Sequence, residues 1–437
     1  MTWSTKSESF PQAIIHLDGD AFFASCEEAI HPEYHGQPVV TGLERGIASS
    51  FNYLAKRRGV KRGMRLFEIK KICPDAIIVA SDYETYSLFS KRMFTIMRRY
   101  TNLVEEYSID EGFADVTGLR RSMHKSYIGM AKDMKETVER ELGLSVSVGL
   151  APTKVLAKLA STCKKPSGLV NISGKNIEKF LCDTPIGHIW GVGPNTSNYL
   201  RQFGIKTAAD FTKQSYEWVM KNLTKPHQEI WRELHGEQVF PVLTEEKTSY
   251  ASISKTKTFT PPSNTRDLVY AQLVKNLENA CIKARRYHLA PERVAIILKE
   301  QSFTVHGLEA TLTRRSNFPQ DILPIIRPLF DRLFSSSTLY RSTGIVLSGL
   351  SSETSIQGSL FESPVRMEKF QRVYTAMDTL SQKFGKHTVH LGASMSAHTS
   401  PAHAGKRGDT AERKQTLLKG ETRRKRLWLP LLLGAVR

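Results

Sequence analysis

Two acidic stretches, far apart in the sequence, have the residue types that bind divalent cations. The first, AIIHLDGDAFF, is an apolar run that ends in Asp18 and Asp20. The second, YSIDEGFADV, places Asp110 next to Glu111 between apolar residues. Mg²⁺ prefers carboxylate oxygens together with substrate phosphates, and two such ions about 4 Å apart can stabilise the attacking and leaving oxygens of a phosphoryl displacement. The two stretches together indicate metal-dependent phosphoryl transfer.

The first stretch alone supports two interpretations. Residues two apart in a strand point to the same face, so we expect Asp18 and Asp20 to form one acidic cluster. A solvated strand end or turn explains a single acidic pair equally well. The second stretch favours the metal site, because two strands with acids at matching ends are what a pair of cations requires.

The surrounding segments predict an α+β arrangement. Apolar runs predict strands at 13–18, 104–109, 113–116 and 145–150. Apolar residues recur every three to four positions within 82–100 and 126–142, which predicts two amphipathic helices. Helices that pack on such a sheet give a domain with the acids at its strand ends.

The composition is that of a globular and strongly basic protein. The chain has 437 residues, 40% of them hydrophobic, and 62 Lys and Arg against 43 Asp and Glu give a net charge of +19. This excess favours a polyanionic partner, although ribosomal or membrane-surface association produces the same balance. Five scattered cysteines without a CxxC pair argue against disulfides or a zinc site and for a reducing cytoplasm. Neither a signal peptide nor a membrane span is expected.

Four motifs resemble those of a known family. IIHLDGDAFFASCEE, NYLAKRRGVKRGM, YSIDEGFADVTG and VSVGLAPTKVLAKLASTCKKPSGL are similar, in this order, to the palm and fingers motifs of Y-family translesion DNA polymerases, most of all the bacterial DinB type. The resemblance continues with lower specificity to about residue 397. It implies an α+β multidomain right-hand polymerase with a small fingers element, a helix-hairpin-helix thumb and a ferredoxin-like little finger.

The resemblance also implies domain boundaries. We expect a palm at 1–24 and 81–180, fingers at 25–80, a thumb at 181–242, a linker at 243–251, a little finger at 252–352, a clamp-binding segment and helix at 353–397, and a basic tail at 398–437.

By the same resemblance, the metal ligands are Asp18, Asp110, Glu111 and the backbone carbonyl of Gly19, and they hold two Mg²⁺ ions. Asp20 is expected to support the site without binding metal, and Asp115 to be a structural acid at a strand end.

Four further residues match positions that contact the incoming nucleotide. Tyr53, Lys56 and Lys165 match the family's triphosphate ligands, but Lys56 stands where Arg is usual, and the two are not equivalent in bidentate contacts. Phe23 matches the steric gate that excludes a ribose 2′-hydroxyl, whereas its spacing alone fits core packing. Lys154 and Lys158, on the helix before Lys165, are expected on a solvated face.

Candidate DNA contacts lie in the thumb and the little finger. Gly191 and Gly193 precede a predicted helix whose amino-terminal N–H groups can approach a phosphate, although a simple turn explains the glycines equally well. In the little finger the candidates are basic residues, for which a solvated face is an equal alternative: Lys255, Lys257, Arg314 and Arg315.

QGSLF, at 357–361, resembles the peptide that tethers bacterial polymerases to the sliding clamp (the β subunit), with Gln357, Leu360 and Phe361 as its contacts. The expected partners are primed template DNA, dNTPs and this clamp. We expect a monomer in the bacterial cytoplasm, associated with the nucleoid and not with a membrane.

The sequence therefore predicts a template-directed DNA polymerase that adds dNTPs to a primer 3′ end with low fidelity, in translesion synthesis. Three alternatives stay open: a phosphatase of the haloacid dehalogenase type, because LDGDAFF resembles its DxD motif; a UmuC-like polymerase subunit that needs accessory proteins; and a non-catalytic, clamp-tethered DNA-binding adaptor.

Overall fold

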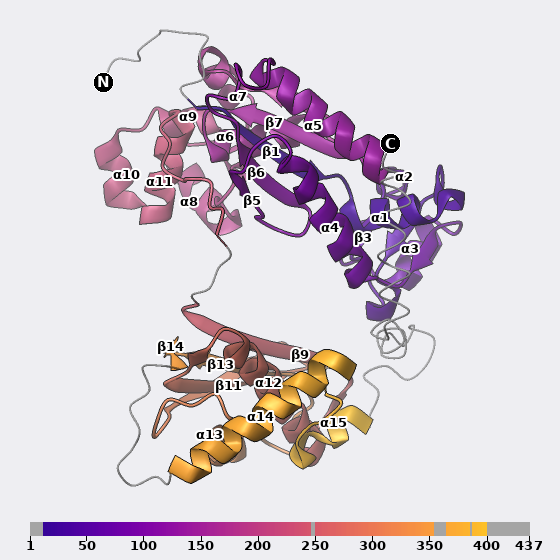
Figure 1. The fold of residues 1–437 in the computed structure, drawn as a ribbon, viewed down its shortest axis with the longest axis vertical. Coiled ribbons are helices and arrows are strands. Elements are labelled where there is room, and N and C mark those ends of the chain that lie inside the picture. The colour runs from indigo at the N-terminus through magenta and orange to yellow at the C-terminus, as the bar shows by residue number, and fades with distance from the viewer. Residues whose placement is uncertain (1–11, 246–249, 354–363, 385–386, 400–437) are drawn as a thin grey trace. The chain divides into compact units, whose positions relative to one another are not determined.

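The computed structural model describes residues 12–245, 250–353, 364–384 and 387–399. The chain forms two compact units that divide near residue 245 (Figure 1). We call the part before this division unit 1 and the part from residue 250 to 399 unit 2. The division falls inside the polar stretch for which the sequence predicts a linker.

A five-stranded sheet with the order β5-β6-β1-β7-β8 forms the centre of unit 1. β1 lies in the middle and runs antiparallel to both neighbours, and its register pairs Asp18 with Glu111. The two acidic stretches therefore meet on adjacent strands. The strands are β1 (Ile14–Gly19), β5 (Val104–Glu105), β6 (Glu111–Asp115), β7 (Val146–Ala151) and β8 (Leu169–Asn171).

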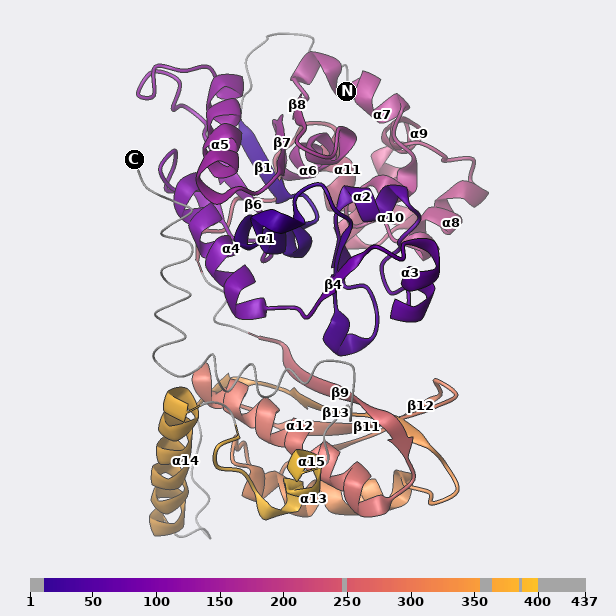
Figure 2. The same cartoon turned by 90° about the vertical axis from the view of Figure 1, so that its right-hand side faces the viewer.

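Both faces of this sheet are covered by helices, so β1 is apolar on both sides. Ile15 and Leu17 pack into a core with α1 (Phe22–Ile30), α4 (Tyr83–Met97) and α5 (Tyr127–Leu142). Ile14 packs into a second core with α6 (Lys154–Cys163). In Figure 2, α5 and α6 lie on opposite sides of β1 and β7. Since strand side chains alternate, His16 and Asp18 share the α6 face with Ile14.

A small second sheet of unit 1, with the order β3-β2-β4, corresponds to the predicted fingers. β2 pairs antiparallel with β3 and parallel with β4, and the core beneath them is small. The elements are β2 (Val39–Thr41), β3 (Ser50–Phe51), α2 (Tyr53–Arg57), α3 (Leu66–Ile72) and β4 (Ile77–Val79).

Short helices follow the large sheet in unit 1. They are α7 (Ile177–Cys182), α8 (Pro194–Gln202), α9 (Ala208–Thr212), α10 (Tyr216–Asn222) and α11 (Lys225–Leu234). The buried carboxylate of Glu233 accepts N–H groups from Val155 at 3.1 Å, Val239 at 2.7 Å and Phe240 at 2.8 Å. These bonds tie α11 and the segment after it to the start of α6.

Unit 2 has the element order βαββαβ, which is that of a ferredoxin-like domain, and its strands run in the order β12-β11-β13-β9 with all neighbours antiparallel. One core joins the sheet to α12 and α13. The elements are β9 (Ser252–Ser263), α12 (Arg266–Arg286), β11 (Arg293–Glu300), β12 (Val305–Thr311), α13 (Pro319–Leu333) and β13 (Tyr340–Ser348).

Additional elements of unit 2 lie outside this frame. A short pair of strands joins β10 (Leu289–Ala290) to β14 (Ser351–Ser352). After them come α14 (Pro364–Phe384), a 3₁₀ turn η6 (Gly392–Ser394) and α15 (Ser396–Thr399). Both η6 and α15 pack on α12.

Several sequence-based boundaries are wrong. The sequence predicts that Pro261 and Pro262 end the strand that begins at residue 252. β9 continues through both, because it is an edge strand whose register shifts opposite Tyr340 to Ser342, and an edge tolerates proline. The sequence also predicts separate strands at 302–306 and 309–314, but the structure has one strand there, β12. β5 ends at Glu105 and not at 109, so Asp110 lies in the loop before β6. The short strands β8, β10 and β14 were not predicted.

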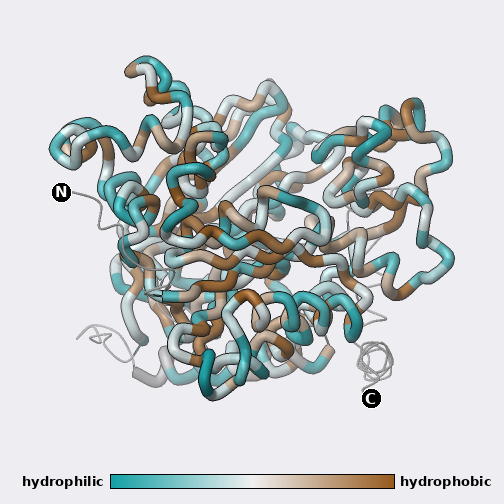
Figure 3. The backbone as a smooth tube through the Cα atoms, turned by 90° about the horizontal axis from the view of Figure 1, so that it is seen from above, coloured by the Kyte–Doolittle hydropathy of each residue, from teal (hydrophilic) through white to brown (hydrophobic). Residues whose placement is uncertain are grey.

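Hydropathy follows this architecture. Figure 3 shows hydrophobic stretches along the strands in the interior and hydrophilic ones along outer helices. Among the helices of the described residues, none combines the length and the apolar content that crossing a bilayer requires.

Candidate active site

The carboxylates of Asp18 and Glu111 lie side by side on the α6 face of the large sheet, because their strands pair at these two residues. Each contacts a lysine: Lys165, just after α6, is paired with Asp18, and Lys158, on α6, is paired with Glu111. The side chains of the two acids are only 16% and 17% exposed. A partly buried pair of carboxylates is thus balanced by two cations.

His16 completes this group, and its role was not anticipated from the sequence. Its ring is fully buried, and Nδ1 lies 2.8 Å from the Ser161 hydroxyl of α6. Nε2 has no hydrogen-bond partner among the described residues and lies 3.3 Å from a Glu111 oxygen. The ligand atoms of His16, Asp18 and Glu111 all lie within 4.8 Å of one another, a spacing at which one ion can be held. In the sequence, the only indication of this role is that His16 lies two residues before Asp18, which places both side chains on the same face of the strand.

The two acids have opposite pKa shifts. Burial is the main cause that raises the pKa of Asp18 to about 6, and the charge of Lys165 offsets it only in part. Burial would also raise the pKa of Glu111, but His16 and Lys158 together lower it to about 2. Burial lowers the pKa of His16 to about 4, so the imidazole is neutral near pH 7. The pKa values of the two cross-strand partners thus differ because burial prevails at Asp18, whereas the contacts with His16 and Lys158 prevail over burial at Glu111.

Asp110 lies beside this group without joining it. Its backbone carbonyl accepts the Gly19 N–H at 2.7 Å, and its carboxylate accepts the Ser108 hydroxyl. The charge of Asp110 nevertheless contributes to the raised pKa of Asp18, so the two carboxylates are near neighbours. Glycine at position 19 leaves room here for both neighbours, because a Cβ there would lie 2.7 Å from the Phe22 ring and 3.4 Å from the Asp110 carbonyl.

Asp20 does not share the cluster, which corrects the expectation that Asp18 and Asp20 form one. β1 ends at Gly19, and Asp20 turns inward to 2% exposure. Its oxygens accept the hydroxyls of Ser145 at 3.0 Å and Ser147 at 2.9 Å and the Ser167 N–H at 2.7 Å. The bond from Ser167 fixes the turn just after Lys165, whose Nζ lies 3.7 Å from Asp20.

The structure brings Tyr53 and Lys56 of α2 toward the same region. Burial, with smaller contributions from the charges of Asp20 and Asp18, raises the pKa of Tyr53 to about 12, so the phenol lies within electrostatic range of these acids. Nζ of Lys56 lies 5.1 Å from the centre of the Tyr53 ring. Asn52 caps α2 through the Ala55 N–H at 3.0 Å, which fixes where this helix begins.

Phe23 is partly buried at the start of α1. Its ring stacks on Tyr86 of α4 at 4.6 Å and meets Tyr83 edge-on at 5.5 Å. The packing holds the ring in one orientation.

Lys154 and Lys158 are not on a solvated face, contrary to the sequence-based expectation. Lys154 is 4% exposed and donates to Glu105 at 2.6 Å. Lys158 lies over the rings of Tyr107 at 5.2 Å and Trp190 at 5.8 Å while pairing with Glu111. The basic side of α6 faces the acids of β5 and β6, which the helix periodicity alone could not show.

The candidate DNA contacts differ in their surroundings. Gly191 has a φ of +87°, and Gly193 precedes Pro194 at the start of α8. Lys255 and Lys257 share the helix-covered face of β9 with buried Ile253 and Phe259.

The two arginines of unit 2 are engaged within the unit. Arg314 is paired with Asp321 at 2.7 Å, and Arg315 with Glu292 at 2.6 Å. A phosphate contact by either arginine has to compete with these ion pairs. The expected clamp contacts Gln357, Leu360 and Phe361 lie outside the described residues, as does most of the basic tail.

Comparisons with known proteins cover most of the chain. The sequence model of the impB/mucB/samB family matches residues 17–162, and that of its C-terminal domain matches residues 250–360. A DNA polymerase IV of Desulfatibacillum aliphaticivorans is 31% identical over 383 residues, which cover 87% of this chain and 96% of that protein. One of Moorella thermoacetica is 32% identical over 391 residues, with coverage of 88% and 96%.

Two solved structures are also similar to this chain. DinB from Sulfolobus solfataricus superposes with a TM-score of 0.51 at 26% identity, over 77% of this chain and 98% of that one. A Y-family DNA polymerase chimera superposes with a TM-score of 0.65 at 24% identity, over 78% and 99%, and this likeness concerns the fold.

Proposed function

The chain belongs to the impB/mucB/samB family of Y-family, DinB-type translesion DNA polymerases, and from this premise we propose that Asp18, Asp110 and Glu111, with the Gly19 carbonyl, hold its catalytic metal ions. It is a DNA-directed DNA polymerase. The phosphatase, UmuC-like and adaptor alternatives are not favoured by this membership. The main observation that supports the proposal is the register of β1 and β6, which pairs Asp18 with Glu111.

The donor atoms suit a divalent ion. Carboxylate oxygens are the ligands that Mg²⁺ prefers, and the neutral, unpartnered Nε2 of His16 lies within reach of the same position. Metal ions bound there would lower the pKa of the primer 3′-hydroxyl and neutralise charge on the departing pyrophosphate. We propose Mg²⁺ as the ion.

The lysines give the site a way to respond to substrate. Lys165 and Lys158 now contact the oxygens that a metal ion needs, so an ion and these ammonium groups compete for the same lone pairs. We propose that Lys165, once displaced from Asp18, binds the triphosphate together with Tyr53 and Lys56. Lys158 stays between the rings of Tyr107 and Trp190, where an ammonium group is favourably held.

Phe23 is proposed as the group that excludes ribonucleotides. Its stacking on Tyr86 prevents the ring from swinging aside, so a 2′-hydroxyl directed at it meets a fixed obstacle. A phenylalanine free to rotate would discriminate less.

Primer extension tests the metal assignment. On primed template DNA with Mg²⁺ and dNTPs, the wild type should extend the primer, and the Asp110→Ala plus Glu111→Ala variant should lose extension while keeping DNA binding. Asp115→Asn is the matched control, because Asp115 lies on the same strand and bonds only locally, to the Thr117 N–H at 2.8 Å. Extension by the double variant at the wild-type rate would refute the assignment.

We further propose that the chain acts as a monomer in the bacterial cytoplasm, near the nucleoid, and that Gln357, Leu360 and Phe361 bind the sliding clamp. The test is the variant Leu360→Ala plus Phe361→Ala. It should extend primers as the wild type does without clamp and lose stimulation when clamp is added. Equal stimulation of both proteins would overturn this part of the proposal.

A further inference from the structure

Unit 2 contains a cluster of ionisable side chains on elements that carry no residue of the candidate active site. Glu278 lies on α12, His387 and His390 follow α14, and His398 lies on α15. One ligand atom each of Glu278, His387 and His398 lie within 4.8 Å of one another. The ring of His390 lies 4.1 Å from that of His398, centre to centre. Glu278 and three histidines at least 109 positions later in the chain thus lie in one cluster.

Two atoms of this cluster are buried without hydrogen-bond partners. Glu278 is 5% exposed, and one of its oxygens accepts the Leu391 N–H at 2.7 Å, whereas Oε2 has no partner among the described residues. The nearby Ser394 hydroxyl donates to the Leu391 carbonyl at 2.9 Å. Nε2 of His398 is also buried and unpartnered. A buried polar atom without a partner is costly. An unpartnered carboxylate oxygen and an unpartnered ring nitrogen in the same cluster therefore point to a ligand that binds both residues.

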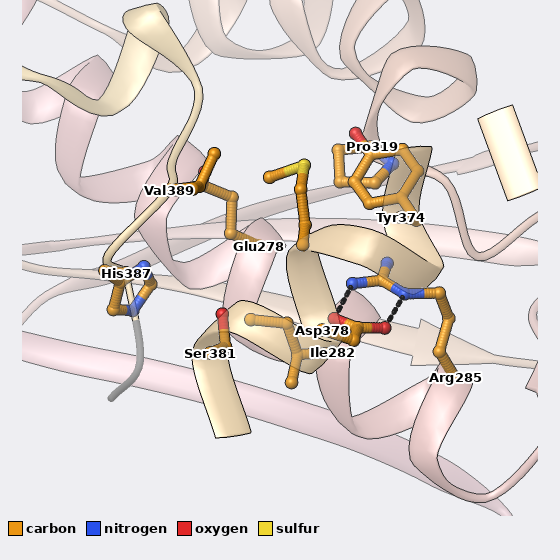
Figure 4. A pocket seen from close by; sticks show the side chains of 10 residues that line it. Glu278, Ile282, Arg285, Pro319, Tyr374, Asp378, Ser381, His387 and Val389 are labelled. Atoms are coloured by element: carbon orange, nitrogen blue, oxygen red, sulfur yellow. Dashed lines mark hydrogen bonds and ion pairs between the residues drawn. The ribbon is translucent and has the colours of Figure 1, made fainter. Parts of the chain in front are cut away.

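The framework that holds these groups is fixed independently of any ligand. Figure 4 shows Glu278, His387 and Val389 lining a pocket where the segment after α14 passes α12. Next to it, Arg285 of α12 binds both oxygens of Asp378 of α14, at 2.7 and 2.8 Å. This bidentate pair anchors α14 to α12, and η6 and α15 pack on the same helix.

One nearby cation opposes metal binding. Lys275, one turn before Glu278 on α12, donates from Nζ to the Ala397 carbonyl at 3.0 Å and is thereby directed at the backbone. The carboxylate of Glu278 offsets the added charge of an ion.

We propose that Glu278, His387 and His398 bind one divalent transition-metal ion, with Zn²⁺ as the preferred ion. His390 is not part of the set of ligand atoms within 4.8 Å of one another, and its Nδ1 lies 3.2 Å from the His387 carbonyl, so it would have to move to become a fourth ligand. Imidazole nitrogens and a carboxylate form a typical zinc ligand set. Zinc–ligand bonds of about 2.0–2.1 Å place tetrahedral ligand atoms about 3.3 Å apart, so the side chains must close by at most about 1.5 Å. The scattered cysteines did not indicate this site because it contains none.

The bound ion would join α12 to the segment 387–398. Without it, this segment is held to α12 by the packing of η6 and α15 and by single hydrogen bonds such as that from Leu391. An ion that binds only the folded unit stabilises it in proportion to its affinity.

The test uses the untagged full chain with Asp18→Asn plus Glu111→Gln as background, which removes two of the three ligands of the His16 cluster. Equilibrium dialysis against Zn²⁺ should show one ion per chain. Adding Glu278→Gln or His398→Ala should weaken binding by more than about 100-fold, since losing even an outer partner of a metal site costs about 10- to 100-fold. Glu278→Gln keeps an acceptor for the Leu391 N–H, so it preserves the local fold.

His306→Ala is the matched control, because His306 pairs with Glu300 at 2.8 Å in the same unit but outside the cluster. It should leave Zn²⁺ binding unchanged, and Zn²⁺ should raise the Tm of the background protein and of this control only. Failure of the background protein to bind Zn²⁺, or equal binding after Glu278→Gln and His398→Ala, would overturn the proposal.

Discussion

Asp18 and Glu111 are cross-strand partners, yet neutralising them should change stability in opposite directions. The pKa of Asp18 is raised from 3.8 to about 6 in the folded protein, chiefly by burial. The contribution of Asp18 to the free energy of unfolding is fully present below about pH 4 and is lost as the pH rises through 6. At about 1.36 kcal/mol per pH unit, the loss near pH 8 is roughly 3 kcal/mol. Asp18→Asn removes the buried charge, so it should stabilise unit 1 by up to about 3 kcal/mol near pH 8.

The pKa shift of Glu111 has the opposite sign. Despite its burial, its pKa is lowered from 4.5 to about 2 by His16 and Lys158. Its contribution is complete above about pH 4.5 and is lost as the pH falls through 2. Glu111→Gln should therefore destabilise unit 1 near pH 8 by roughly 3 kcal/mol. Both side chains are less than a third exposed, so solvent screens these energies only in part.

Urea unfolding followed by tryptophan fluorescence measures both effects. The described tryptophans, Trp190, Trp218 and Trp231, all lie in unit 1. Lys165 keeps Asp20 as a neighbour at 3.7 Å in the Asp18→Asn variant, so no cation is stranded. The gain from Asp18→Asn should vanish as the pH falls toward 4. This account of the site's electrostatics would be refuted if both Asp18→Asn and Glu111→Gln lowered the free energy of unfolding. It would also be refuted if the gain from Asp18→Asn did not depend on pH.

Three further outcomes are expected. Phe23→Ala should raise the ratio of ribonucleotide to deoxynucleotide incorporation in primer extension, because it removes the ring stacked on Tyr86; an unchanged ratio would exclude Phe23 as the gate. Glu233→Ala should lower the free energy of unfolding of unit 1 by about 3–5 kcal/mol in urea, because one buried and two partly buried backbone N–H groups lose a charged acceptor. A loss below about 1 kcal/mol would contradict this. Gly191→Ala should cost about 1–3 kcal/mol in the same assay, since its φ is +87° and its new Cβ would lie 2.5 Å from an isoleucine methyl. Gly193→Ala, which meets nothing within 4 Å, should cost clearly less.

The pattern of the palm was accessible from the sequence because strand and helix periodicities are local. The predicted strands at 13–18, 113–116 and 145–150 correspond to β1, β6 and β7, and the predicted helices to α4 and α5. The predicted strand boundaries were wrong where the position of the strand in its sheet decides where it ends. β9 continues through Pro261 and Pro262 because it is an edge strand. No residue within β9 indicates that the strand lies at the edge of its sheet.

The sequence by itself determined which acids and lysines the polymerase motifs supply, and in what order. Tertiary structure decided how they pair. Lys158 turns to Glu111 and Asp20 turns to a set of serine and backbone donors, because side chains from distant segments meet only when the sheet and α6 pack. Burial at Asp18 and close contacts with His16 and Lys158 at Glu111 set the two opposite pKa shifts, and neither can be read from composition and spacing. The Glu278–His398 cluster has the same origin, since its ligands converge only where the end of unit 2 folds back on α12.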